Sequence, residues 1–488
     1  MRRTLLTPLA LLVTAAALAG ACATESTEDP GLTFGGDGGF EPDANLDEDI
    51  IEPIAPDTGL DGGTAPTSDQ VVEAALTDVD AFWSRSYEEL YGEPYQPIEG
   101  GFWPYGPDTE QPPCGEPPPG YNDIAENAFF CPAADLVAWD NVNLIPGLYD
   151  EFGGFTLGIV FAHEFGHAIQ FRADTQGDTV MLELQADCFA GAWTADVEAG
   201  KSDYFTLTLG DLDKAVAGFL ELRDGVGTAA ADPAAHGTGF DRIGSFVEGF
   251  EQGLERCAAY PDLYASGELV VVEVPFTDPV DFERGGNLPL DELAPALLAD
   301  LENFWTLLFE EQGEPTWTPV TDVIGVDPDV DEVACGGDTH SGDVLVNASF
   351  YCIDDDTIYL DEVNLIPALN EIGDYAVATE IARQYAYAAQ VRLGNTENTL
   401  GTNLQADCLA GVYAFSGFVG NREGLGGELF LSPGDLDEAV IAFLLNSDSS
   451  EDVEAGNVSV GTAFQRFDAY RSGFLEGTPA CDALLDAG

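Results

Sequence analysis

The alternation of hydrophobic and polar positions predicts the same series of elements twice along the chain. A stretch with helical periodicity surrounds Trp83, and another surrounds Trp305. Each is followed by a loop rich in proline and glycine and then by a short pair of strands, which end near Asp140 and near Asp361. Three or four helices follow, and the GDLD sequences are typical of helix starts because acidic groups favour the positive end of the helix dipole. We therefore expect an α+β fold, mostly helical, with a small β-sheet or hairpin in each half.

Direct sequence matches indicate that the two halves are copies of one domain. FFCPAADLVAWDNVNLIPGL returns as FYCIDDDTIYLDEVNLIPAL, GDLDKAVAGFL returns as GDLDEAVIAFL, and LQADCFAG returns as LQADCLAG. The chain of 488 residues is long enough for two such domains. We predict that the copies occupy residues 67–270 and 285–488, with residues 271–284 as the linker between them.

An apolar stretch of the first copy carries the candidate chemistry. TLGIVFAHEFGHAIQF has one helix breaker, Gly166, and a helix there places His163 and His167 on one face, where both imidazoles can bind one metal ion. Glu164 lies about 100° round the helix axis and can reach a water molecule on that ion. Buried histidine and glutamate side chains cost free energy unless they are paired or bind a metal, which favours zinc over a purely structural role.

A catalytic zinc needs a third protein ligand, and the LELQADCFAG segment can supply it. Glu183 and Asp187 are four residues apart and share one helical face. We predict Glu183 as the third ligand and Asp187 as the acceptor of the other ring N–H of a ligand histidine. A solvated acidic pair is the alternative, because the whole chain is acidic. Ala190 and Gly191, on the same face, are expected to let this helix approach the histidine helix closely.

The second copy lacks all of these metal-binding and catalytic groups. The two histidines, the candidate base and the third ligand are replaced there by Arg383, Tyr387, Gln384 and Asn403. We therefore predict one zinc ion per chain, in the first copy only, and a degenerate, non-catalytic second copy. The aspartate of LQADC persists as Asp407, so Arg383 and Asp407 are expected to form a bidentate ion pair where the first copy supports its metal.

The cysteines follow the duplication, apart from Cys22. They recur at matching positions in the two copies, Cys114, Cys131, Cys188 and Cys257 in the first and Cys335, Cys352, Cys408 and Cys481 in the second. Of the three pairings that four cysteines allow, we favour Cys114 with Cys131 and Cys188 with Cys257, because the first pair brackets a predicted hairpin. Zinc binding by cysteine is the alternative, although no CxxC spacing occurs.

The N-terminus predicts export. In MRRTLLTPLALLVTAAALAGAC, two arginines, an apolar run and small residues lead to Cys22, and LAGAC resembles the lipobox of bacterial lipoproteins. We predict a signal peptide over residues 1–21, lipidation of Cys22 and an acidic disordered tether over residues 22–66. These features place the protein in the cell envelope as a lipoprotein. Secretion after an ordinary signal peptide is the alternative.

The charge balance restricts the partners of the protein. There are 15 basic and 89 acidic residues, a formal net charge of −74, so nucleic acids and anionic membrane surfaces repel it. We expect a peptide or protein substrate, and contact with a membrane through the lipid anchor only.

The combination of HEFGH with ELQADCFAG resembles a bacterial family of neutral zinc metallopeptidases, and Glu-x-x-Ala-Asp is similar to the third-ligand motif of the wider gluzincin group. The FFCPAAD and HGTGFDR segments share this likeness. It implies a zincin-like domain that hydrolyses peptide bonds, with Glu164 as the general base. His236 is a candidate donor to the oxyanion or to the substrate. Two other hypotheses stay open: a non-catalytic surface-binding lipoprotein and a zinc hydrolase that acts on a non-peptide bond.

Overall fold

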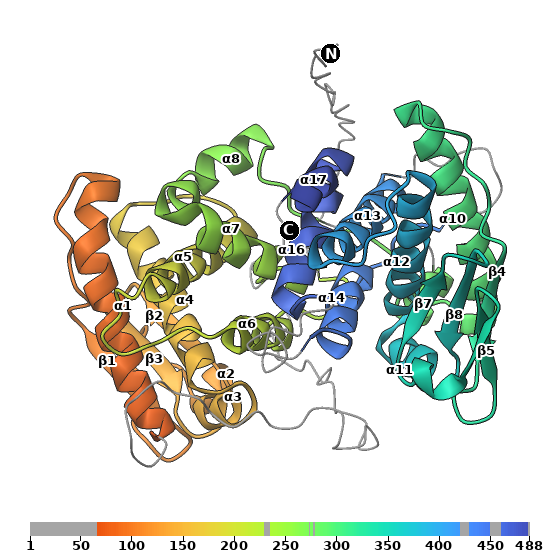
Figure 1. Ribbon diagram of the computed structural model, residues 1–488. Coiled ribbons are helices and arrows are strands. Elements are labelled where there is room, and N and C mark those ends of the chain that lie inside the picture. The colour runs from red at the N-terminus through yellow and green to blue at the C-terminus, as the bar shows by residue number, and fades with distance from the viewer. Residues whose placement is uncertain are drawn as a thin grey trace, which may run out of the picture. The chain divides into compact units, whose positions relative to one another are not determined.

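The computed structural model describes residues 66–228, 235–272, 274–276, 279–419, 429–448 and 460–486. They form an α+β fold in which two similar, mostly helical sets of elements each include a small sheet, as predicted (Figure 1). The predicted signal peptide and lipidation site at Cys22 lie outside these residues, as does the predicted tether except for its last residue. Within the described ranges, no helix has the length and apolar character needed to span a membrane.

The first copy runs from a long helix through a small sheet to a group of packed helices. Its elements are α1 (Ser68–Tyr91), β1 (Gly101–Tyr105), α2 (Tyr121–Ile124), β2 (Ala128–Cys131), β3 (Leu136–Asp140), α3 (Leu144–Phe152), α4 (Gly154–Arg172), α5 (Thr179–Glu198), α6 (Leu209–Glu221), α7 (Gly239–Ala258) and α8 (Tyr260–Ser266). The strand order is β1-β3-β2, with β1 parallel and β2 antiparallel to β3. α4 packs against α1, β2 and α5, and α5 packs against α7 (Figure 1).

The second copy repeats this order, except that a two-stranded sheet of β5 and β6 and the short η1 stand where the first copy has α2. Its elements, with the short α9 before it, are α9 (Pro279–Glu283), α10 (Leu290–Gln312), β4 (Asp322–Val326), β5 (Glu332–Cys335), β6 (Asp338–Ser341), η1 (Gly342–Leu345), β7 (Ser349–Cys352), β8 (Thr357–Asp361), α11 (Leu365–Ile372), α12 (Asp374–Arg392), α13 (Leu400–Phe418), α14 (Asp435–Leu445), α16 (Ala463–Glu476), α17 (Thr478–Ala483) and η2 (Leu484–Asp486). The sequence predicted a pair of strands in each copy, but each copy has a three-stranded sheet. The additional strand, β1 or β4, is parallel to its neighbour. Pro104 in β1 and Gly325 in β4 weaken the strand pattern, which explains the omission.

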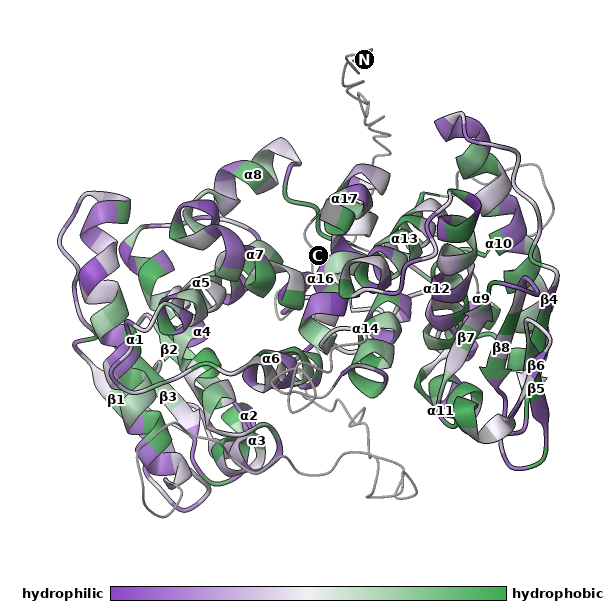
Figure 2. Cartoon of the chain, in the orientation of Figure 1, coloured by the Kyte–Doolittle hydropathy of each residue, from purple (hydrophilic) through white to green (hydrophobic). Residues whose placement is uncertain are grey.

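The central helices are buried on all sides, whereas the outer helix is amphipathic. Along α4 and α5, buried residues occupy nearly every position of the middle turns. Along α1, hydrophilic and hydrophobic residues alternate because one face packs on α4 (Figure 2). Local signals fix both ends of α1. Thr67 caps its first turn, and Gly92 ends it in the left-handed region with a φ of 75°.

The helices that carry the repeated LQADC segments, α5 and α13, each touch a later helix backbone to backbone, at the glycine that ends LQADCFAG or LQADCLAG. A Cβ on Gly191 would lie 1.9 Å from the carbonyl oxygen of Phe246 in α7, so only glycine permits this approach. Gly411 makes the same contact between α13 and α16. The prediction that Gly191 faces the histidine helix is therefore wrong, because it faces α7. The close contact of α4 with α5 is instead made by Gly166, whose Cβ would lie 2.9 Å from the Cα of Ala186.

All four predicted disulfides form, and they pair the cysteines in the same way in both copies. They join Cys114 to Cys131, Cys188 to Cys257, Cys335 to Cys352 and Cys408 to Cys481. The second bond of each copy ties the LQADC helix to a later helix. The reason given for the first pair is wrong, because the segment between Cys114 and Cys131 contains α2 and β2, and the hairpin of β2 with β3 continues beyond it.

Each copy caps a helix of the other copy. Asp437 in α14 accepts the backbone N–H groups of Gly239 at 3.2 Å and Phe240 at 2.8 Å, at the start of α7. Its counterpart Asp213 in α6 accepts the N–H of Phe464 at 2.8 Å, at the start of α16. The first N–H groups of a helix have no partner within the helix, so each aspartate satisfies donors that would otherwise be buried and unpaired.

The substitution Asp437→Ala is expected to loosen α7 although it lies in the other copy. It leaves the buried N–H groups of Gly239 and Phe240 without acceptors, which costs about 1–3 kcal/mol. Hydrogen exchange at the start of α7 should become faster, and the urea midpoint of unfolding should fall. The exposed Glu311→Ala variant serves as the control and should change neither quantity. Unaltered exchange in α7 would show that the cap contributes nothing.

Candidate metal centre

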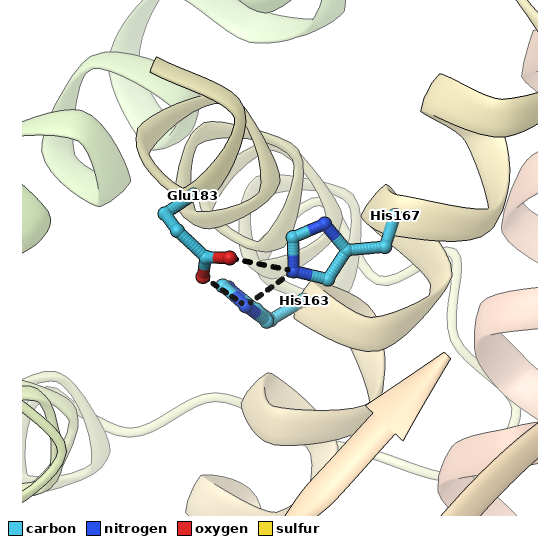
Figure 3. A group of neighbouring side chains, drawn as sticks. All are labelled: His163, His167 and Glu183. Carbon is cyan, nitrogen blue, oxygen red and sulfur yellow. Dashed lines mark hydrogen bonds and ion pairs between the residues drawn. The ribbon is translucent and has the colours of Figure 1, made fainter. Parts of the chain in front are cut away.

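Two adjacent helices bring the three predicted ligands together. α4 carries His163 and His167, one turn apart, and α5 carries Glu183 (Figure 3). The Nε2 atom of His163 lies 3.1 Å from Nε2 of His167 and 3.3 Å from Oε2 of Glu183. Nε2 of His167 lies 3.5 Å from Oε1 of Glu183. The three donor groups therefore converge on one small volume.

The outer nitrogens of both imidazoles are held by hydrogen-bond acceptors. Nδ1 of His163 donates to Oδ1 of Asp187 at 2.7 Å, the contact predicted from the sequence. Nδ1 of His167 donates to Oε1 of Gln170 at 2.9 Å, and the Gln170 amide donates to the carbonyl of Leu182 at 2.6 Å. In the neutral rings the proton is then on Nδ1, and each Nε2 presents a lone pair to the other. A metal ion between them removes this repulsion, and two imidazoles with one carboxylate form a donor set typical of catalytic zinc.

The electrostatics of the cluster favour a bound positive charge. Burial alone lowers the pKa of His163, but Asp187 and Glu183 outweigh it and raise that pKa to about 10. Burial raises the pKa of Glu183, but the two histidines outweigh it and hold that pKa well below its usual range. Oε2 of Glu183 is also buried, and apart from its ion-pair contact with His163 it has no hydrogen-bond partner among the described residues. The residues present therefore fit a divalent metal ion.

Arg242 in α7 supports this cluster and was missed in the sequence. Its Nε donates to Oδ2 of Asp187 at 2.8 Å, and its Nη2 donates to Oδ1 at 2.9 Å. Burial raises the pKa of Asp187, but Arg242 and then His163 outweigh it and lower that pKa. Arg242 and its counterpart Arg466 stand in the matched GTGFDR and GTAFQR segments, in a chain with few basic residues. This retention of an arginine in both copies could have indicated its structural role. Gln170 is likewise retained in the second copy, as Gln390.

Glu164, the predicted base, lies in the same cavity as the three converging groups. Its Oε2 accepts the backbone N–H of Phe130 in β2 at 2.8 Å, and its side chain is buried. Burial raises the pKa of Glu164 above its usual value. The cavity has a volume of about 550 Å³, and its lining includes His163, His167 and Glu183. Its size suits a peptide side chain or a small ligand.

His236 also lines this cavity but is much more exposed than the other groups. Its side chain is 53% exposed, and its Nδ1 lies 3.3 Å from Oδ1 of Asp224. Oδ2 of Asp224 accepts the backbone N–H groups of His236 and Gly237, both at 2.8 Å. In the second copy, Asp448 holds the same loop, with Val460 in the place of the histidine. The role of His236 as a donor to the oxyanion or the substrate stays a prediction.

In the second copy, the side chains that replace the candidate ligands contact one another and Asp407. Nε of Arg383 lies 2.8 Å from Oδ1 of Asp407, so the predicted ion pair is present. Its predicted bidentate geometry is wrong, because apart from this ion-pair contact Nε and Nη2 of Arg383 have no hydrogen-bond partner among the described residues. Arg466 instead contacts both oxygens of Asp407, each at 3.0 Å. Tyr387 donates a hydrogen bond to Asn403, and the guanidinium of Arg383 lies over the Tyr387 ring. A fixed cation thus stands near the position that the metal-binding groups occupy in the first copy.

Comparison with known proteins identifies the family. A family model described as "Putative neutral zinc metallopeptidase" matches residues 62–260 and again residues 285–484. The chain belongs to this zinc metallopeptidase family. Because the two matches cover most of the chain and do not overlap, this member carries the family region twice.

Two curated relatives of this chain are both called "Uncharacterized protein YpfJ". They come from Escherichia coli K12 and from Escherichia coli O6:H1, and each is 29% identical over 150 residues. The match covers 26% of this chain and 50% of each relative, so the chain spans about half the length of the curated relatives it matches. No solved structure matches the chain significantly.

The substitution Asp187→Asn is expected to weaken zinc binding about 10- to 100-fold, because the amide no longer supports His163 as a carboxylate does. Competition with a chelator of known affinity measures this change. Asp407→Asn is the matched control, since it removes the same buried aspartate from the second copy. It should lower the stability of the protein and leave the zinc affinity unchanged. Equal zinc affinities for Asp187→Asn and wild type would contradict the supporting role.

Proposed function

We propose that the protein is an exported zinc-dependent peptidase with a single active site in its first copy. The observation that carries this proposal is the convergence of His163, His167 and Glu183 in a cavity that also contains Glu164. Membership of a zinc metallopeptidase family supports the same conclusion. The second copy has none of these four groups at the matching positions. We therefore assign one zinc ion per chain to the first copy, and no activity to the second copy.

The proposed mechanism divides the work between the ligands and Glu164. His163, His167 and Glu183 would hold the zinc ion. When bound, zinc supplies a Lewis acid for the scissile carbonyl and lowers the pKa of a bound water molecule towards neutrality. Glu164 accepts the proton of the attacking water and later donates it to the leaving amine. The N–H of Phe130 holds one carboxylate oxygen of Glu164, so the group does not need to reorient before it reacts.

Positioning of the substrate is assigned to the cavity walls. β2 is an edge strand of its sheet, and residues 126–130 line the cavity. An extended peptide can add to such an edge through its backbone. Apolar side chains, among them Leu144, Ile159 and Phe219, form much of the remaining wall. We therefore expect a peptide substrate with an apolar side chain near the cleaved bond, and we assign His236 at the rim a contact with the substrate or the oxyanion.

The proposed location is outside the cytoplasm. The described residues contain four disulfides, which persist in oxidising compartments. We propose lipidation at Cys22 and attachment to the cell envelope through that lipid, with secretion as the alternative. The formal net charge of −74 argues against nucleic acid as a partner.

The substitution Glu164→Gln tests the mechanism most directly. Cleavage of a peptide library should fall about 10²- to 10⁴-fold, the usual contribution of a general base, while the zinc content stays at one ion per chain. Gln384→Ala is the matched control, because it alters the equivalent position of the second copy. It should retain full activity. Glu183→Ala should lose both zinc and cleavage.

Other outcomes would select the other hypotheses. Wild-type protein that binds zinc but cleaves no peptide, while it hydrolyses esters or other amides, would be a hydrolase of non-peptide bonds. Zinc binding without any hydrolysis would indicate a surface-binding protein. A preparation made without chelators that contains no zinc would contradict both enzymatic hypotheses, the zinc peptidase and the zinc hydrolase of non-peptide bonds.

A further inference from the structure

Three acidic side chains of the second copy meet in its interior, far from the zinc-type cluster in the sequence. Asp374 is the first residue of α12, and Asp435 and Glu438 lie in the first turn of α14. One oxygen from each lies within 4.8 Å of the others. The residues are 7%, 3% and 7% exposed, respectively. α12 and α14 pack side by side (Figure 1), so the first turns of two neighbouring helices supply the three carboxylates.

A backbone N–H group donates to one oxygen of each carboxylate. The second oxygen of Asp374 and the second oxygen of Asp435 have no hydrogen-bond partner among the described residues. Oδ2 of Asp374 accepts the N–H of Leu288 at 2.8 Å, and Oδ2 of Asp435 accepts the N–H of Ser432 at 2.7 Å. The Oδ1 atoms of Asp374 and Asp435 are buried and have no hydrogen-bond partner among the described residues. Such buried, unpaired carboxylate oxygens are costly unless a cation or a proton compensates them.

Glu438 completes the group and brings no compensating charge. Its Oε2 accepts the N–H of Tyr375 at 2.9 Å. No ion pair joins any of the three carboxylates to an arginine or lysine in the part of the chain that the structure describes. Burial, and then the neighbouring carboxylates, raise the pKa of Glu438 to about 8. Burial also raises the pKa of Asp374 to about 6, although backbone N–H groups oppose the shift.

The first copy carries a lysine at one of the three matching positions. Its counterparts of Asp374, Asp435 and Glu438 are Gly154, Asp211 and Lys214. A Cβ on Gly153 would lie 3.8 Å from Nζ of Lys214, and a Cβ on the matching Gly373 would lie 2.0 Å from the carboxyl carbon of Glu438. The ammonium group and the carboxylate thus occupy similar places. One aspartate with one lysine in the first copy has become three carboxylates in the second.

We propose that Asp374, Asp435 and Glu438 bind a calcium ion, which takes the place of the lost ammonium group. All three donors are hard carboxylate oxygens, which suit calcium or magnesium and not zinc. Calcium is favoured because it accepts irregular sets of buried oxygens, whereas magnesium keeps most of its water molecules. The ion joins the starts of α12 and α14 and, through the hydrogen bond of Leu288 to Asp374, the residues just before α10. Its role is structural and independent of hydrolysis.

Calcium binding to the full-length, chelator-treated protein tests this proposal. Isothermal titration with CaCl₂ should show one saturable calcium ion per chain, and the melting temperature should rise by several degrees in millimolar calcium. Glu438→Lys restores the arrangement of the first copy, so the protein should fold, lose calcium affinity at least tenfold and no longer respond in melting temperature. Asp374→Gly also introduces the residue of the first copy and should lose calcium affinity. It provides a second test in case the Glu438→Lys variant does not fold.

Two controls separate this site from other acidic groups. Asp329→Asn alters the exposed acidic loop before β5 and should bind calcium like wild type. Glu183→Ala should keep the calcium response, so failure of the proposed zinc function and failure of the calcium site are distinguishable. Wild type without a saturable calcium site would overturn the proposal and indicate protonated carboxyls instead. Retention of wild-type calcium affinity in both repeat-copying variants, or equal affinity for MgCl₂, would overturn it as well.

Discussion

The buried ion pair between Asp187 and Arg242 is the constraint on which the first copy's site depends. Both side chains are almost completely enclosed, and taking two charges out of water is costly unless they pair with good geometry. Arg242 contacts both oxygens of the carboxylate, which leaves Oδ1 of Asp187 directed at the His163 ring. The pair therefore decides which nitrogen of His163 carries its proton and which one faces the cavity. The same pair exists in the second copy as Asp407 with Arg466, although the groups around it have changed.

At two buried positions, one copy holds a side-chain cation where the other copy gathers candidate metal ligands. In the first copy, the position between the central helices gathers His163, His167 and Glu183, while in the second copy the cation of Arg383 stands there. At the start of α14 the difference has the opposite sign, because the carboxylate of Glu438 occupies the place that the ammonium group of Lys214 has in the first copy. A buried cluster of one sign needs a counter-charge, and either a side chain or a bound ion can supply it. The degenerate copy has therefore lost one set of charges and gained another.

The second copy also acts on the fold of the first. Asp437 caps α7, and α7 carries Arg242 one turn later. Asp213 returns the same contact to α16. This reciprocal arrangement gives a physical reason to retain a copy without catalytic groups. The helix that supports Asp187 begins against an aspartate of the other copy, so the candidate site and the interface between copies share one element.

The sequence by itself determined the parts of this protein that depend on local spacing or on comparison of its two halves. Histidines four residues apart share a helical face, and matched cysteines point to the same disulfides in each copy, so these features could be read from the letters. The tertiary structure alone decided the rest. Arg242 contacts Asp187, which lies 55 residues away in the sequence. The parallel strands β1 and β4 pair with strands that come later in the chain. Asp374 lies near Glu438 only because α12 packs on α14. Such contacts depend on how distant elements pack, and no periodicity within a segment encodes that packing.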